Sequence, residues 1–148
     1  MRQYVLALAV LILCSPAALA SGGLSCEAND ANLNLAVESG VTHGMGGPFF
    51  NFKASAEITE ASVHPSLKKL TLDEDLVHHW LDGKVLYLSF YRETAANEPH
   101  ANVEIVVETS QAEEGSYAGK YTLSAFAAEP AADAENPKVV TGDVTCFV

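Results

Sequence analysis

Imidazole and carboxylate side chains gather in one short stretch of the chain, between Asp73 and Asp82. Four of them are candidate metal ligands: Asp75, His78, His79 and Asp82. On a helix, Asp75 and His79 are four residues apart and Asp82 lies three beyond His79, so their side chains would share one face. Imidazole and carboxylate groups are ligands for Zn²⁺ and other divalent ions. The spacing therefore permits a divalent-metal site, and with it metal-assisted hydrolysis, on a helical segment.

The same residues have an explanation without metal. Acidic side chains are favoured at the start of a helix and histidines near its end, so the cluster also describes a solvated polar face. On a strand, His78 and His79 would point to opposite faces and could not bind one ion together. The sequence contains no GxSxG, HExxH or phosphate-binding Gly-Lys-Ser motif. We therefore expect a protein without enzymatic activity and without a cofactor.

The segment that carries this cluster fits two local structures. As a hairpin, a type I′ turn at Asp82-Gly83 would pair Trp80 with Val85. As a helix, Thr71 and Glu74 would form a capping box and Gly83 would end the helix. The apolar residues then fall on one side, which favours the helix: Leu72, Leu76, Val77, Trp80 and Leu81. We predict a short helix near residues 72–82.

Aromatic residues offer a second candidate site. Tyr87 and Tyr91 recur on one face of an expected strand, and in the hairpin interpretation His78 and Trp80 would join them as a stripe able to receive another protein or a sugar. We favour the alternative, in which a helix or an opposite sheet covers these rings, and we treat Tyr117 and Tyr121 as core in the same way. The candidate binding surface comprises His43, Phe49, Trp80, Tyr87 and Tyr91.

The composition limits the possible partners. The chain has 148 residues, with 8 Lys and Arg against 19 Asp and Glu, for a formal net charge of −11. Such acidity repels phosphate backbones and anionic lipid surfaces, which argues against nucleic-acid binding. It would instead steer a basic exported protein toward this one, an attraction that weakens with salt.

The first 20 residues are typical of a cleaved export signal. Arg2 precedes an apolar run, and the small-residue triplet Ala18-Leu19-Ala20 makes Ser21 the expected first mature residue. A lipid anchor on Cys14 is the alternative, but bulky Leu13 stands where a small residue is expected. No later stretch reaches the roughly 20 apolar residues that a membrane span needs. We therefore predict a periplasmic or extracellular protein without membrane insertion, with a single domain over residues 21–148.

Two cysteines remain after cleavage, Cys26 and Cys146. An even number of cysteines in an oxidising compartment indicates a disulfide, which here would join the two ends of the domain. A metal or redox pair is the alternative, but neither cysteine has CxxC spacing or an adjacent histidine. We predict a Cys26–Cys146 disulfide.

Apolar and polar residues alternate in most of the remaining chain, with the period of a half-buried strand. Segments of this kind include residues 33–37, 50–58, 85–91, 103–107, 117–123 and 140–148. With a short strand near residues 67–72, they predict an all-β antiparallel sandwich of about seven strands, or as second choice a small β-barrel. The function that we expect is a non-catalytic binding module of the inhibitor or accessory-subunit type, using a sheet face or the glycine-rich loop at residues 40–49. A divalent-metal protein is the alternative.

Overall fold

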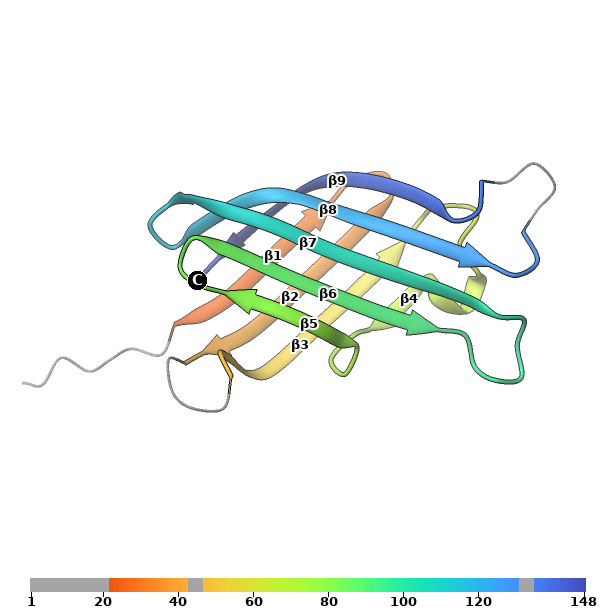
Figure 1. Ribbon diagram of the computed structural model, residues 1–148, viewed down its shortest axis with the longest axis horizontal. Helices are drawn as coiled ribbons and strands as arrows, with labels where there is room; N and C mark the ends of the chain where they lie inside the picture. Colours follow the sequence, from red (N-terminus) through yellow and green to blue (C-terminus); the bar gives the residue numbers. More distant parts are fainter. Residues whose placement is uncertain (1–21, 43–46, 131–134) are drawn as a thin grey trace, which may run out of the picture.

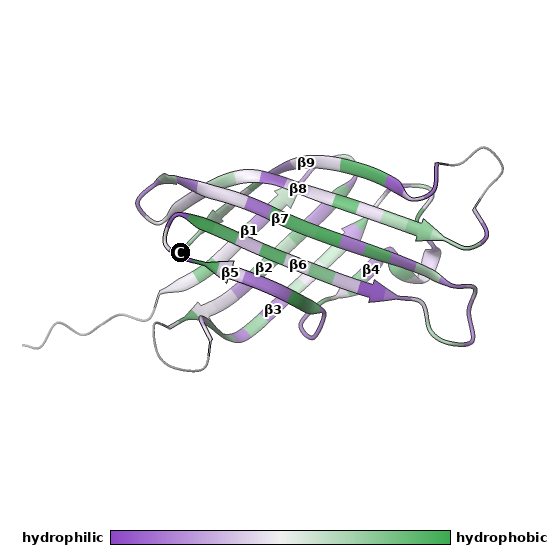
Figure 2. Ribbon diagram, viewed as in Figure 1, coloured by the Kyte–Doolittle hydropathy of each residue, from purple (hydrophilic) through white to green (hydrophobic). Residues whose placement is uncertain are grey.

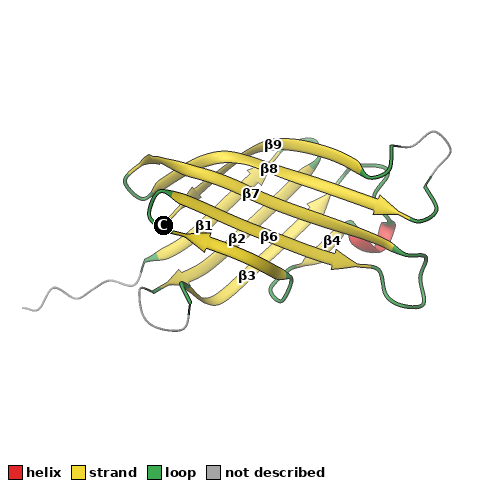
Figure 3. Cartoon of the chain, viewed as in Figure 1, coloured by secondary structure: helices red, strands yellow, loops and turns green. Residues whose placement is uncertain are grey.

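The computed structural model describes residues 22–42, 47–130 and 135–148 and is all-β, as predicted. The predicted signal peptide, residues 1–20, lies outside the described residues. The strands are β1 (Gly23–Asn29), β2 (Leu33–Val41), β3 (Phe49–Ile58), β4 (Lys69–Thr71), β5 (Leu76–Leu81), β6 (Val85–Glu93), β7 (Ala101–Glu113), β8 (Ser116–Ala127) and β9 (Lys138–Phe147). Figure 3 shows one short 3-10 turn at Pro65–Leu67 among them. No helix in the described part of the chain is long and apolar enough to cross a bilayer.

The strands form because apolar side chains recur at every second position. In β2, for example, Leu33, Leu35 and Val37 are buried while the residues between them are exposed. Figure 2 shows the resulting alternation of hydrophobic and hydrophilic residues along most of the strands. Most strands therefore have one face toward the core and one toward solvent, whereas β5 has no fully buried residue.

All nine strands belong to one antiparallel sheet in the order β4-β3-β2-β1-β9-β8-β7-β6-β5. The order consists of two meanders, β1–β4 and β5–β9, which meet where β1 pairs with β9 (Figure 1). That junction has three paired positions, and one of them is Cys26 opposite Cys146. The predicted disulfide is present there, between buried side chains separated by 120 positions in sequence.

The sheet curls into a half-barrel. Its two edge strands, β4 and β5, are consecutive in the chain and are joined by residues 72–75, so the edges must approach each other at this end. Rings from β3 and β6 also meet across the interior, with Phe52 and Phe90 centroids 6.1 Å apart. The predicted sandwich of about seven strands is not confirmed, because the nine strands form one curled sheet instead of two packed sheets.

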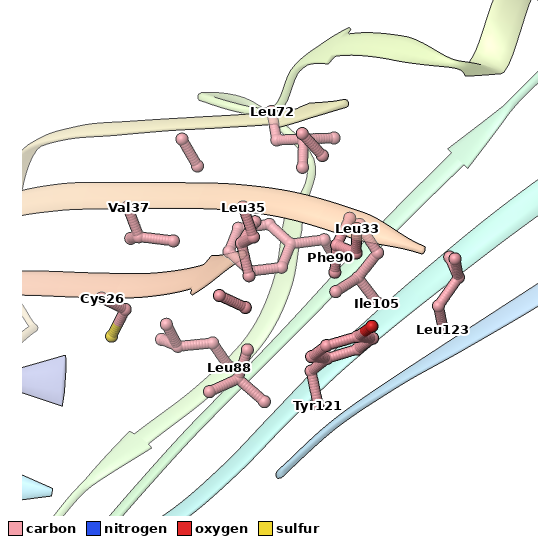
Figure 4. Close-up of a cluster of buried hydrophobic side chains, with 14 of the residues drawn as sticks. Cys26, Leu33, Leu35, Val37, Leu72, Leu88, Phe90, Ile105, Tyr121 and Leu123 are labelled. Carbon is pink, nitrogen blue, oxygen red and sulfur yellow. The ribbon is translucent and has the colours of Figure 1, made fainter. Parts of the chain in front are cut away.

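The core lies inside this curl. Figure 4 shows Leu33 and Leu35 of β2 facing Phe90 of β6 and Ile105 of β7. Tyr121 of β8 is fully buried, and its hydroxyl donates a hydrogen bond to Asp30 in the β1–β2 turn. The interpretation of Tyr117 and Tyr121 as core residues is therefore confirmed.

The predicted helix near residues 72–82 is wrong, because Leu76–Leu81 forms strand β5. The acids at the expected start of the helix are used elsewhere: the Asp73 carboxylate accepts a hydrogen bond from the Ala54 amide, and Asp75 forms an ion pair with Arg92. Strand β6 would otherwise lack a partner on this side, so pairing with β5 satisfies its backbone groups. Gly83, at φ +86°, serves the hairpin turn rather than a helix end.

Candidate functional site

The outer face of the β5–β6 hairpin carries four rings: His78, Trp80, Tyr87 and Tyr91, which we call the aromatic patch. Trp80 lies directly opposite Tyr87 in the ladder. A type I′ turn at Asp82-Gly83 would instead have paired Trp80 with Val85, two positions away. The His78 and Tyr87 rings meet edge to face, with centroids 5.6 Å apart. These pairings fix the rings on one side of two hydrogen-bonded strands.

The patch faces solvent. The exposed fraction of Trp80 is 58%, Tyr91 is also exposed and Tyr87 is half-buried. The interpretation in which a helix or a second sheet covers these rings is therefore wrong, because β5 is itself an edge strand of a single sheet. Solvent-exposed aromatic rings on neighbouring strands are typical of a surface that binds a partner.

Carboxylates border the patch on the side of β7. Glu108 is paired with Tyr87 and Glu104 with Tyr91, and both glutamates are exposed. The Tyr91 hydroxyl donates a 2.7 Å hydrogen bond to Glu93. This hydrogen bond, with desolvation and the charges of Glu93 and Glu104, raises the pKa of Tyr91. Three carboxylates, Glu93, Glu104 and Glu108, therefore lie beside the tyrosines of the patch.

A fourth carboxylate, Asp82, stands at the hairpin turn. Its oxygen accepts 2.9 Å hydrogen bonds from the amides of Lys84 and Val85. These two bonds, followed by one from the Trp80 side chain, lower the pKa of Asp82, so it stays ionised into the acidic range. We call Asp82, Glu93, Glu104 and Glu108 the acidic rim; Lys84 is the one basic side chain in this turn.

The four candidate metal ligands do not come together. His78 lies on the outer face, whereas the His79 ring is on the inner side, 5.2 Å from the ring of Phe49. Asp75 is held by Arg92, and Asp82 accepts the turn amides. Over the described ranges, no three His, Cys, Asp or Glu side chains are grouped as metal ligands are. The helical spacing on which the metal hypothesis depended is absent.

The predicted binding surface has two further members, His43 and Phe49. His43 falls outside the described residues. Phe49 is half-buried at the start of β3 and packs on Phe52, with centroids 6.0 Å apart, as well as on His79. Phe49 therefore closes the interior and is not part of the outer surface.

A pocket of about 300 Å³ opens beside the same hairpin. Its wall includes Leu81 and Gly83 from the hairpin, Val41 and Pro48 from β2 and the entry to β3, and Tyr117 from β8.

Sequence reasoning missed this pocket and the rim glutamates. The alternation of Glu104 and Glu108 with apolar residues predicts that they are exposed, but their place beside Tyr87 and Tyr91 depends on the β6–β7 register.

No protein-family model, curated protein or solved structure matches this chain.

Proposed function

We propose that this protein is a non-catalytic binding module whose aromatic patch engages a basic segment of a partner protein. The observation that carries the proposal is the set of solvent-facing rings on the β5–β6 hairpin, bordered by carboxylates. Tyrosine and tryptophan provide large contact areas with little rotamer entropy to lose on binding. We also propose that the protein acts after export, in the periplasm or outside the cell, as an inhibitor or accessory subunit.

Charge selects the kind of partner. The acidic rim presents four carboxylates around the patch, and the whole chain carries a formal charge of −11. Lysine and arginine side chains can stack on the rings while their charges meet the rim. A second copy of this acidic chain would be repelled, which favours a different, basic protein as the partner.

Site-specific photocrosslinking in the cell that makes the protein tests this proposal. A photoreactive phenylalanine analogue replaces Trp80 in one variant and Val139 in a control variant; Val139 is 47% exposed on β9, away from the hairpin. We expect position 80, and not position 139, to capture a protein rich in lysine and arginine, with a lower yield at high salt. Equal capture at both positions, capture of an acidic protein or no capture at position 80 would each refute the proposal.

The carboxylates themselves can be tested in the same assay. Glu104→Gln and Glu108→Gln together remove two charges from the rim and keep the size of both side chains. We expect the crosslinked yield at position 80 to fall, because long-range attraction to a basic partner is weakened. A matched change of two exposed acids on the distant strands, Glu27→Gln with Glu38→Gln, serves as the control.

A further inference from the structure

The two edges of the half-barrel differ in how they are protected. Edge strand β4 has three residues, and its Lys69 forms a 3.0 Å ion pair with Glu57. Edge strand β5 has six residues, Leu-Val-His-His-Trp-Leu, without lysine, acid or proline. Short length and charged side chains are the usual means by which an edge strand avoids pairing with another chain. Strand β5 is therefore a much more open template for pairing than β4.

The register identifies which backbone groups of β5 face outward. The Asp82 amide donates to the Val85 carbonyl and the Tyr91 amide to the Asp75 carbonyl, which sets the alternation of bonded and non-bonded pairs. The N–H and C=O groups of Trp80 then point to β6, whereas those of His79 and Leu81 point to the free edge. Among the described residues, no backbone hydrogen bond joins this edge of β5 to another segment.

The free edge has side-chain features on both of its faces. On the outer side, His78 and Trp80 belong to the aromatic patch. At the turn end, the pocket beside Leu81 is walled by Val41, Pro48 and Tyr117, and it opens where the β5 edge approaches the entry to β3. Recognition of an extended peptide by strand addition combines these elements, because backbone bonds provide affinity and pockets for alternate side chains provide specificity.

We propose that a basic, extended segment of the partner protein adds as a strand to the free edge of β5 and inserts an apolar side chain into the pocket beside Leu81. This inference rests on the proposed binding function and specifies its mode. Alternate side chains of the added strand point to opposite faces. Basic residues then lie over the aromatic patch and its acidic rim, while the residues between them turn toward Leu81 and the interior.

Two substitutions at one position isolate the backbone contribution. His79→Ala removes the imidazole, including its contact with Phe49, but keeps the outward N–H. His79→Pro removes the imidazole and that N–H together; proline is tolerated on an edge strand when the lost N–H faced solvent. Both variants keep the Trp80 and His78 backbone groups that pair with β6. Circular dichroism and thermal melting of the oxidised proteins test whether the two variants are equally folded.

The probe is a blocked peptide of about six residues that alternates lysine and leucine, a typical strand length. Its controls are the same peptide with glutamate for lysine, and the same peptide N-methylated on alternate amides so that it cannot donate to an edge. Binding is followed by isothermal titration calorimetry, which also serves the tryptophan-free Trp80→Ala variant, and by amide hydrogen exchange. In the variants that keep Trp80, the one tryptophan of the chain, its fluorescence is a further measure. We expect binding of the lysine peptide alone, with slowed exchange at the His79 and Leu81 amides. We also expect an affinity about tenfold or more lower for His79→Pro than for His79→Ala.

The outcomes separate the two proposals. If the lysine peptide binds, and Trp80→Ala weakens it, but the His79→Pro and His79→Ala variants bind it equally, strand addition is refuted and binding to the patch is retained. If the N-methylated peptide binds as tightly as its parent, the same conclusion holds. If the lysine peptide binds neither the native protein nor any variant, or binds no better than the glutamate peptide, strand addition by a basic segment is refuted. Photocrosslinking at position 80 then decides separately whether the patch binds a partner in another way.

Discussion

The hydroxyl of Tyr121 in β8 donates a 2.7 Å hydrogen bond to the carboxylate of Asp30, in the turn between β1 and β2. Strand β9 lies between these two elements in the sheet. The bond therefore spans the junction between the two meanders, where β1 and β9 share three paired positions. Asp30 also accepts bonds from the amides of Asn32 and Leu33, so one carboxylate fixes both the turn and the junction.

Acid should weaken this junction. Desolvation by itself would raise the pKa of Asp30, but the hydrogen bonds from Tyr121 and from the two amides outweigh it, and the pKa lies below the ordinary value of 3.8. Ionised Asp30 therefore stabilises the fold at neutral pH, and this contribution is lost as the pH falls below about 3.8. We expect the melting temperature to fall less steeply with acidification in Asp30→Asn than in the native protein. Identical pH profiles would contradict this assignment.

Gly142 makes the Tyr121–Asp30 bond possible. A Cβ atom at Gly142 would lie 2.1 Å from the Asp30 carboxylate and 2.3 Å from the Tyr121 ring. We expect Gly142→Ala to separate the two groups and to destabilise the fold by about 1–3 kcal/mol, measured by urea denaturation. Gly23→Ala is the control, because its added Cβ would meet nothing closer than 3.8 Å. Equal stability of the two variants would show that the junction accommodates the methyl group.

The disulfide should contribute much of the stability of the domain. Cys26 and Cys146 are separated by 120 positions, and the chain-entropy model gives about 4–5 kcal/mol for closing a loop of this length. We expect Cys26→Ala with Cys146→Ala to lower the free energy of unfolding by an amount of that order, in urea titrations without reductant. Adding dithiothreitol should destabilise the native protein to a similar extent and leave the double variant unchanged. A loss below about 1 kcal/mol would indicate that the β1–β9 pairing is sufficient by itself.

Most of the strands were predictable from sequence, but β1, β5 and the way in which the sheet closes were not. Alternation at Leu33, Leu35 and Val37 is local information, and it gave the correct structure there. For β5, the local signals were misleading: Thr71, Glu74 and Gly83 resemble helix caps, and the helical period matched. The deciding contacts are distant in sequence, namely Asp73 with Ala54 and Asp75 with Arg92.

The candidate site was predictable to a similar degree. The sequence identified Trp80, Tyr87 and Tyr91 as a possible binding surface, but their exposure depends on β5 being an edge strand, which only the sheet order reveals. The acidic rim also depends on register, because Glu104 and Tyr91 are 13 positions apart in sequence and meet through the β6–β7 pairing. The disulfide needed no such information, since Cys26 and Cys146 are the two cysteines that remain when the predicted signal peptide, which contains Cys14, is set aside.

The field around Trp80 can be measured without a partner. Trp80 is the one tryptophan and is largely exposed, so its fluorescence reports on the ions that reach the patch. Because the acidic rim attracts cations, we expect caesium to quench Trp80 more strongly, and iodide less strongly, than each quenches free tryptophan amide. High salt should reduce both deviations. The same deviations should shrink in Glu104→Gln with Glu108→Gln, and quenching by iodide as efficient as on the free amide would contradict a negative field.

The position of the disulfide also determines how the domain responds to mechanical force. Cys26 and Cys146 lie close to the two ends of the described chain, and they bond across neighbouring strands. Tension applied at the ends would therefore pass through one covalent bond, and just the short segments outside the cysteines would extend. The rest of both meanders, the core and the β5–β6 hairpin lie outside this path and carry no load. Once a thiol reductant has broken the disulfide, the β1–β9 junction carries the tension. The same pull would then separate the two meanders by breaking the β1–β9 pairs one after another.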